Sequence, residues 1–142
     1  MPGTIPPGGT RGTLYAAIAR ARLEDAACLL QGSRVDGAIY LAGYAIECCL
    51  KEAVCVRTRR KYLPASQEVH SWDRLVESAR LWPAIKAQPD VFLLYSSLAE
   101  KWRSSKWGSA LRYRTGLFNR REAERLYSEV VELYYSLVEM IQ

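Results

Sequence analysis

Hydrophobic residues are most concentrated between Ala38 and Val54, in the stretch AIYLAGYAIECCLKEAV. At 100° per residue, Ile39, Ile46 and Leu50 lie on one face of a helix, and the opposite face is largely apolar too. A helix of this kind must be covered from several directions, so we predict that it lies at the centre of the fold. Gly43 disfavours a helix by about 1 kcal/mol relative to Ala, which predicts that another backbone approaches closely there.

A narrow polar stripe separates the two apolar faces of this central helix. It consists of Tyr40, Tyr44, Glu47 and Lys51. Glu47 and Lys51 are four residues apart, in the order that favours a helical ion pair. The stripe has two interpretations. In one, Glu47 holds Arg112 in place beneath a binding cleft; in the other, Glu47 belongs to a buried ion pair that fixes the register of the helix.

The same helical periodicity predicts four further helices. The first covers residues 13–31, and the central helix then starts at Ser33 or Asp36 and runs to about Arg60. Ser71 has the position of a cap for a short third helix, which Pro83 stops because proline disrupts a helix interior. Pro89 opens the fourth helix, since proline is favoured in the first turn.

A start signal also precedes the last helix. Asn119 is followed three residues later by Glu122, which is the spacing of a capping box, and an apolar stripe then continues to Ile141. No convincing strand or internal repeat is present. These observations predict an all-α fold, an up-and-down bundle of four main helices plus a short helix.

The length of 142 residues fits one domain. Residues 1–12 contain three prolines and four glycines and are predicted to be a flexible tail, which leaves residues 13–142 as the helical domain. No long uncharged apolar stretch and no leader is present, so we expect a cytoplasmic protein without a membrane segment. The cysteines lack the paired spacing of a zinc site and are interpreted as reduced packing residues, without metal or cofactor. They are Cys28, Cys48, Cys49 and Cys55.

Positive charge is concentrated in one part of the chain, although the net charge is only +5. Residues 101–121 contain seven basic residues and no acid. A second cluster, residues 57–61, ends the central helix, where cations complement the helix dipole, and we favour this structural explanation over a binding role. Most of the basic residues are arginines, whose planar guanidinium groups suit phosphate recognition.

The aperiodic connection before the last helix is the strongest candidate for a binding site. Connections this long are usually functional or disordered. This one interleaves aromatic residues with arginines, an arrangement in which rings stack on bases and guanidinium groups hold phosphates. Two arginines in the first turn of the last helix would add to an anion site. The candidate nucleotide- or RNA-binding residues are Arg103, Lys106, Trp107, Arg112, Tyr113, Arg114, Arg120 and Arg121.

These residues have a structural alternative. The arginines would then solvate the connection or pair with acids of the last helix, among them Glu122 and Glu124. Trp102 and Trp107 would fill the core at a helix end. The sequence alone leaves both interpretations open.

Four segments form a pattern that spans most of residues 13–142. They are YLAGYAIECCLKE at 40–52, His70-Ser-Trp with Leu75, Trp107, and Arg112-Tyr113 before the last helix. This pattern resembles a HEPN domain (higher eukaryotes and prokaryotes nucleotide-binding domain), most specifically at residues 44–51. The resemblance implies an antiparallel helical bundle that dimerises. It also implies binding of, or action on, RNA or nucleotides in toxin-antitoxin and defence systems, often beside a minimal nucleotidyltransferase.

HEPN ribonucleases have an arginine followed after four to six residues by a histidine, the pair that would activate the ribose 2′-hydroxyl. His70 is the single histidine of the chain and lies ten residues after Arg60. The corresponding window after Arg112 ends at Asn119, which cannot transfer a proton at neutral pH. The motif is absent, so no catalytic residue is assigned. We interpret His70 as a hydrogen-bonding loop residue.

The principal prediction is a non-catalytic HEPN-like module that binds nucleotide or RNA phosphates and is paired with a nucleotidyltransferase or toxin-antitoxin partner. The nine tyrosines, including the Tyr134-Tyr135 pair, leave enough apolar surface to predict a homodimer. One alternative is a homodimeric interaction adaptor without nucleic-acid binding. The other is a divergent metal-independent ribonuclease.

Overall fold

The computed structural model describes residues 13–63, 69–104 and 107–141. Within these ranges the chain is helical and contains no strand, which confirms the predicted fold class. The elements in order are α1 (Thr13–Gln31), α2 (Val35–Thr58), α3 (Trp72–Ser78), α4 (Trp82–Lys86), α5 (Pro89–Arg103), the 3₁₀ helix η2 (Gly108–Arg112) and α6 (Arg120–Ile141). The proposed tail, residues 1–12, lies outside the described residues, as does Lys106.

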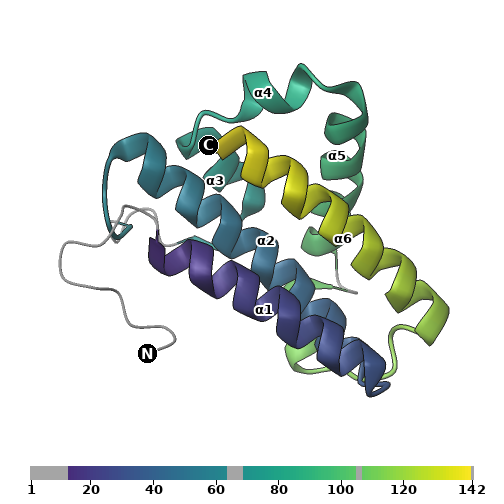
Figure 1. Ribbon diagram of the computed structural model, residues 1–142. Helices are drawn as coiled ribbons and strands as arrows, with labels where there is room; N and C mark the ends of the chain where they lie inside the picture. Colours follow the sequence, from purple (N-terminus) through teal and green to yellow (C-terminus); the bar gives the residue numbers. More distant parts are fainter. Residues whose placement is uncertain (1–12, 64–68, 105–106, 142) are drawn as a thin grey trace.

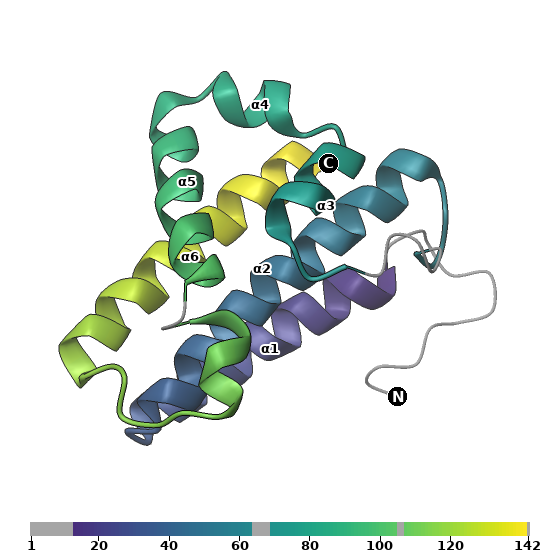
Figure 2. The same ribbon diagram turned by 180° about the vertical axis from the view of Figure 1, so that it is seen from behind.

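Helix α2 is the centre of the bundle, as its apolar faces predict. It lies beside α1 and is also contacted by α6, α3 and η2 (Figures 1 and 2). Ile39, Ile46 and Leu50 have no exposed surface. Because neighbours cover α2 on several sides, residues far apart in the sequence are brought together along it.

Two of the predicted start signals, at Ser71 and at Asn119, are confirmed, whereas α2 begins after Arg34 without a side-chain cap. The hydroxyl of Ser71 accepts a hydrogen bond from the backbone N–H of Arg74 at 3.3 Å, so it caps α3. The Asn119 Oδ1 accepts from the Glu122 N–H at 2.8 Å, and the Glu122 carboxylate accepts from the Asn119 N–H at 3.2 Å. This is the predicted capping box of α6.

The prediction that Pro83 ends a helix is wrong. Helix α3 already ends at Ser78, and Pro83 lies in the first turn of a further short helix, α4. Proline is tolerated there because a first-turn N–H has no partner inside the helix. The described residues therefore form six α-helices rather than five. The aperiodic connection, in addition, contains η2.

Gly43 marks a close approach, but by side chains rather than by the predicted backbone. A Cβ atom on Gly43 would lie 2.5 Å from Cε3 of Trp102 and 2.8 Å from Cζ2 of Trp107. The two indole rings pack edge to face, with centroids 5.0 Å apart. Gly108, at φ 62°, follows Trp107 directly and allows the chain to turn sharply against the backbone of Trp102. Small residues on α2 and in the turn therefore make room for the tryptophan pair.

We expect Gly43→Ala to lower the free energy of unfolding by about 1–3 kcal/mol, because the overpacked indoles outweigh the gain in helix propensity. Gly37→Ala is the matched control on the same helix. A Cβ at Gly37 would lie 3.5 Å from the Cδ1 of Leu29, an ordinary contact, so this variant gains stability instead. Urea unfolding followed by circular dichroism measures both. Equal stabilities for the two variants would show that the indoles move aside freely.

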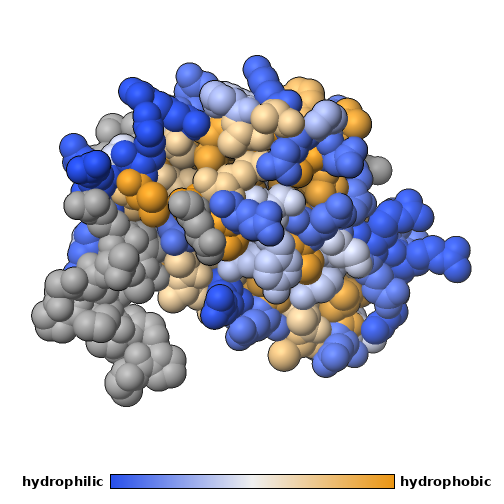
Figure 3. Space-filling view, turned by 45° about the horizontal axis from the view of Figure 1, so that its top comes forward, coloured by the Kyte–Doolittle hydropathy of each residue, from blue (hydrophilic) through white to orange (hydrophobic). Residues whose placement is uncertain are grey.

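The surface carries scattered hydrophobic side chains. Figure 3 shows hydrophobic areas separated by hydrophilic side chains on one face. The largest exposed apolar residues are Val56, Tyr62, Phe92, Leu93, Tyr113 and Tyr135. Cys28 is exposed, contrary to the packing role predicted for it, whereas the other three cysteines are buried. No described helix is both long and apolar enough to span a membrane.

Candidate functional site

An open cleft of about 590 Å³ lies where α2, the start of α3, the end of α5 and η2 meet. Figure 2 shows the η2 segment lying across α2. We call this cavity the Arg112 cleft. The residues that determine its chemistry are Tyr40, Glu47, His70, Arg103, Arg112 and Tyr113. The structure therefore joins part of the basic connection to the polar stripe of the central helix.

Arg112 is an exposed cation held in position by an aromatic residue. Its Nε donates a hydrogen bond to the Tyr40 hydroxyl at 2.7 Å, and its guanidinium carbon lies 5.6 Å from the Tyr40 ring centroid. This hydrogen bond is the main cause that raises the pKa of Arg112, and the negative charge of Glu47 contributes. Within residues 13–63, 69–104 and 107–141, no carboxylate forms an ion pair with Arg112. Its charge is thus positioned without being neutralised by a bound acid.

Arg103 lies at the same cleft but already has an acidic partner. Its Nη1 lies 2.8 Å from Oδ2 of Asp73, and the Tyr95 hydroxyl donates to the other oxygen of Asp73 at 2.7 Å. Burial, together with the hydrogen bond to Asp73, raises the pKa of Tyr95. The ion pair is about half exposed, so the positive charge of Arg103 is only partly offset and water screens the pair.

Glu47 forms a buried junction between two basic groups. Its carboxylate side chain is 3% exposed, and its Oε2 accepts a hydrogen bond from Lys51 Nζ at 3.0 Å. The same oxygen lies 3.1 Å from His70 Nδ1. Glu47 therefore makes the predicted ion pair with Lys51 and also lines the cleft. Its direct partner there is His70 rather than Arg112.

His70 makes the hydrogen bond predicted for it, but in an unexpected place. Its side chain is 73% exposed and faces the Arg112 cleft. Glu47 and His70 are 23 residues apart and lie on different elements, so no periodic pattern links them. The sequence signal that could have found this position is the adjacent cap, Ser71, which fixes where the chain enters α3.

The assignment of Trp107 as a base-stacking residue is wrong. Its side chain is 1% exposed, and its Nε1–H donates to the backbone oxygen of Ile39 at 2.9 Å. The indole makes edge-to-face contacts with Trp102 and Trp72, and its burial leaves no surface on which a base could stack. Trp102, by contrast, lines the cleft and stacks on Tyr40, with centroids 6.2 Å apart. The aromatic wall of the cleft is therefore formed by Tyr40 and Trp102.

Arg120 is used to hold the fold together. Its Nε lies 2.8 Å from the Glu124 carboxylate, and its Nη1 donates to the Ser33 hydroxyl at 2.9 Å. Nearby, the Gly116 N–H donates to the carboxylate of Asp36 at the start of α2. These contacts tie the connection and the start of α6 to the turn between α1 and α2. This is the intramolecular pairing that the structural alternative anticipated for the arginines.

The remaining predicted residues are only partly gathered at the site. Tyr113 lies at the cleft and is 86% exposed, so its ring is available to a ligand. Arg114 and Arg121 are exposed but do not line the cleft. Tyr44 lies beside Cys48, and burial raises its pKa to about 12. Lys51 contributes through Glu47 alone, because its side chain is only 11% exposed.

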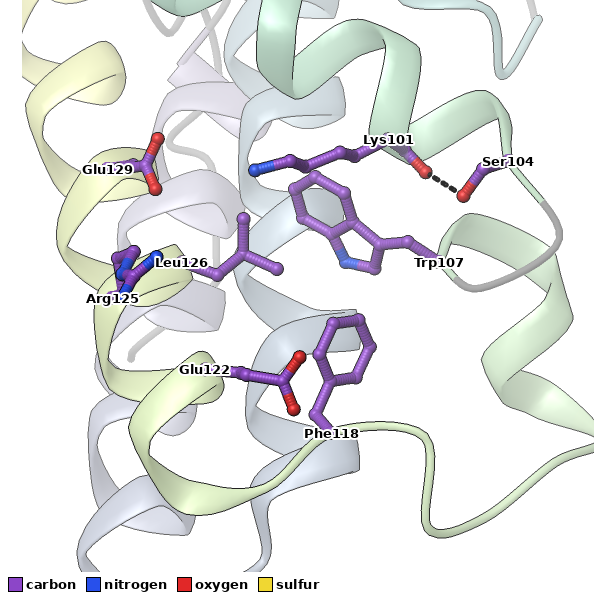
Figure 4. A pocket seen from close by; sticks show the side chains of 8 residues that line it. All are labelled: Lys101, Ser104, Trp107, Phe118, Glu122, Arg125, Leu126 and Glu129. Atoms are coloured by element: carbon purple, nitrogen blue, oxygen red, sulfur yellow. Dashed lines mark hydrogen bonds between the residues drawn. The ribbon is translucent and has the colours of Figure 1, made fainter.

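A second, smaller pocket of about 240 Å³ lies between the end of α5 and α6 (Figure 4). Lys101 reaches over the Trp107 ring from one side, and Glu122 and Glu129 project from α6 on the other. Glu122 is engaged in the capping box. The two carboxylates balance the two basic residues of the lining, Lys101 and Arg125, so this pocket has no excess of positive charge and the Arg112 cleft is the better candidate for a polyanion.

Comparison with protein-family models, curated proteins and solved structures finds no match to this chain. Within the described part of the chain, no group of three or more His, Cys, Asp or Glu residues is arranged to hold a metal ion. The chemistry available in the cleft is that of arginine, imidazole, carboxylate and phenol groups.

Proposed function

We propose that this chain is a HEPN-like helical module that binds nucleotide or RNA phosphates in the Arg112 cleft. The observation that supports this most directly is Arg112 itself. Its guanidinium group is exposed, oriented by Tyr40 and not paired with a described carboxylate. Such a group offers parallel N–H donors that match the oxygens of a phosphate.

The dimensions and the lining of the cleft suit a nucleotide. A volume of about 590 Å³ is within the range of small-ligand sites. Tyr113 presents an exposed ring on which a base can stack, and Arg103 adds a second, partly offset positive charge. Glu47 is the acid of this lining, and its charge is shared between Lys51 and His70. The net character of the cleft is therefore cationic and aromatic.

The proposal includes the assembly implied by the resemblance. The module forms a homodimer and works with a nucleotidyltransferase or another toxin-antitoxin or defence partner. Exposed apolar side chains such as Leu93 and Tyr135 provide surface for such contacts. The Arg-to-His ribonuclease motif is absent, so the proposed role is binding.

The test is the affinity for a fluorescent single-stranded RNA oligonucleotide, measured by anisotropy at several salt concentrations. We expect Arg112→Gln to weaken binding about tenfold, since it removes a charge-assisted hydrogen bond. The slope of the logarithm of the association constant against the logarithm of the salt concentration becomes less negative by about 0.7 for each phosphate that the variant no longer neutralises. Arg60→Gln removes the same charge from an exposed site at the end of α2, away from the cleft, and is the matched control.

Other outcomes separate the alternatives. Equal weakening by both variants indicates nonspecific attraction to positive charge, and the cleft is then not the site. Absence of binding even at low salt supports an adaptor whose basic surface meets an acidic protein. RNA cleavage that persists on repurification and is lost in Arg112→Gln supports a ribonuclease.

A further inference from the structure

The contact between Glu47 and His70 resembles no ordinary surface pair. The carboxylate is almost completely buried, whereas the imidazole that it contacts is largely exposed. Burying a carboxylate is unfavourable unless it is paired, and Lys51 already provides the pairing charge. The contact with His70 therefore does more than compensate the buried charge. It fixes one ring nitrogen of an imidazole at the edge of an anion-binding cleft.

This contact determines which imidazole nitrogen is reactive. An ionised carboxylate only accepts hydrogen bonds, so the Nδ1 of His70, 3.1 Å away, must carry the proton. In the neutral ring the lone pair is then on Nε2, the nitrogen not used by Glu47. A carboxylate behind the ring also stabilises positive charge that develops on it, as in nucleophile-base-acid systems.

The surroundings of His70 favour a phosphoryl group at Nε2. Arg112 and Arg103 line the same cleft and can hold phosphoryl oxygens. Glu47, whose Oε2 lies 3.1 Å from the Nδ1 of His70, lines the same cleft as Arg112, so the imidazole and the guanidinium group share one carboxylate neighbour. Exposure of the ring leaves room for an incoming phosphorus atom.

We infer that His70 accepts a phosphoryl group on Nε2 from an acyl phosphate or phosphoramidate bound in the Arg112 cleft. The inference rests on the proposed phosphate site but adds covalent chemistry to it. The Nε2 lone pair forms the new N–P bond while the bond from phosphorus to the leaving group breaks. With phosphoramidate, the electron pair of the broken bond leaves with ammonia. The ring becomes positively charged, and Glu47 stabilises this charge through Nδ1–H.

Incubation with phosphoramidate tests the inference, because the chain has a single histidine. Intact mass spectrometry at neutral pH counts the phosphoryl groups added, and ³¹P NMR identifies the N–P bond. We expect the folded protein to be labelled once and faster than the same chain unfolded in urea. His70→Ala removes the label. Glu47→Gln slows labelling about tenfold, the lower end of the loss seen when a metal-ligating histidine loses its carboxylate partner.

Two further variants keep the test decisive if Glu47→Gln unfolds the protein. Arg112→Gln alters an exposed side chain and should slow labelling, whereas Arg60→Gln should label at the wild-type rate. Equal rates in the folded and unfolded chain, or label at another residue, would overturn the inference. In that case, retained RNA binding by the wild type leaves the proposed function standing. Fast labelling without RNA binding supports the phosphorylation of His70 and contradicts the proposed binding of nucleotides or RNA.

Discussion

Replacing Trp107 with Ala is expected to lower the free energy of unfolding by about 3–5 kcal/mol. The indole is fully buried between Trp102 and Trp72, and it donates a hydrogen bond to the backbone of Ile39 on α2. Its removal leaves a cavity where η2 meets the central helix. A loss of this size is a large part of the stability of a single domain, so the variant is expected to be partly unfolded at physiological temperature.

Tyr113→Ala is the control that separates a packing role from a binding role. Tyr113 lies in the same connection but is 86% exposed. Its removal should change stability by less than about 0.5 kcal/mol. It should weaken RNA binding by about 1–3 kcal/mol, the usual cost of losing a stacked base. Urea unfolding followed by circular dichroism, together with anisotropy, measures both quantities. If Trp107→Ala were as stable as the wild type and bound RNA poorly, a base-stacking role for Trp107 would be supported after all.

The two aromatic residues show what the sequence could and could not predict about the connection. Both Trp107 and Tyr113 lie among arginines without any helical period, so nothing local separates them. Their environments differ because the glycine at position 43 leaves room for one indole on α2. The space beside Gly43 depends on how α2, α5 and η2 pack together, and this tertiary packing cannot be read from the local sequence.

The helices are easier to predict because their signals are local. The capping box at Asn119 and Glu122 and the cap at Ser71 involve residues three positions apart, and both appear as predicted. Pro83 misleads because proline signals both the end of one helix and the first turn of another. Because α3 already ends at Ser78, Pro83 does not end that helix and instead belongs to the first turn of α4.

The site is less predictable from the sequence than the helices and more predictable than the environments of the two aromatic residues. The sequence predicts that Arg112, Tyr113 and Glu47 take part, and the structure gathers all three around one cleft. The sequence cannot predict that Glu47 contacts His70, because this contact spans 23 residues and depends on how the loop before α3 meets α2. Nor can it show that Arg120 is engaged within the fold, because the bond from Arg120 to Ser33 spans 87 residues.

Lys51→Met is expected to lower the free energy of unfolding by about 3 kcal/mol, because it leaves the buried Glu47 carboxylate without its ammonium partner. The double variant Glu47→Met/Lys51→Met removes both charges and keeps apolar volume. Replacing a buried ion pair in this way is often neutral or stabilising, so the double variant should regain most of the lost stability. Urea unfolding of Lys51→Met, of Glu47→Met and of the double variant measures the coupling free energy between Glu47 and Lys51.

The double variant also shows why the chain keeps a charged pair in its core. If stability returns while phosphoramidate labelling of His70 falls, Glu47 serves the cleft and not the fold, since an apolar pair would pack as well. A Lys51→Met variant as stable as the wild type would contradict this reasoning. The pair would then behave as a solvated surface contact despite its low exposure, and the orientation of His70 would need another cause.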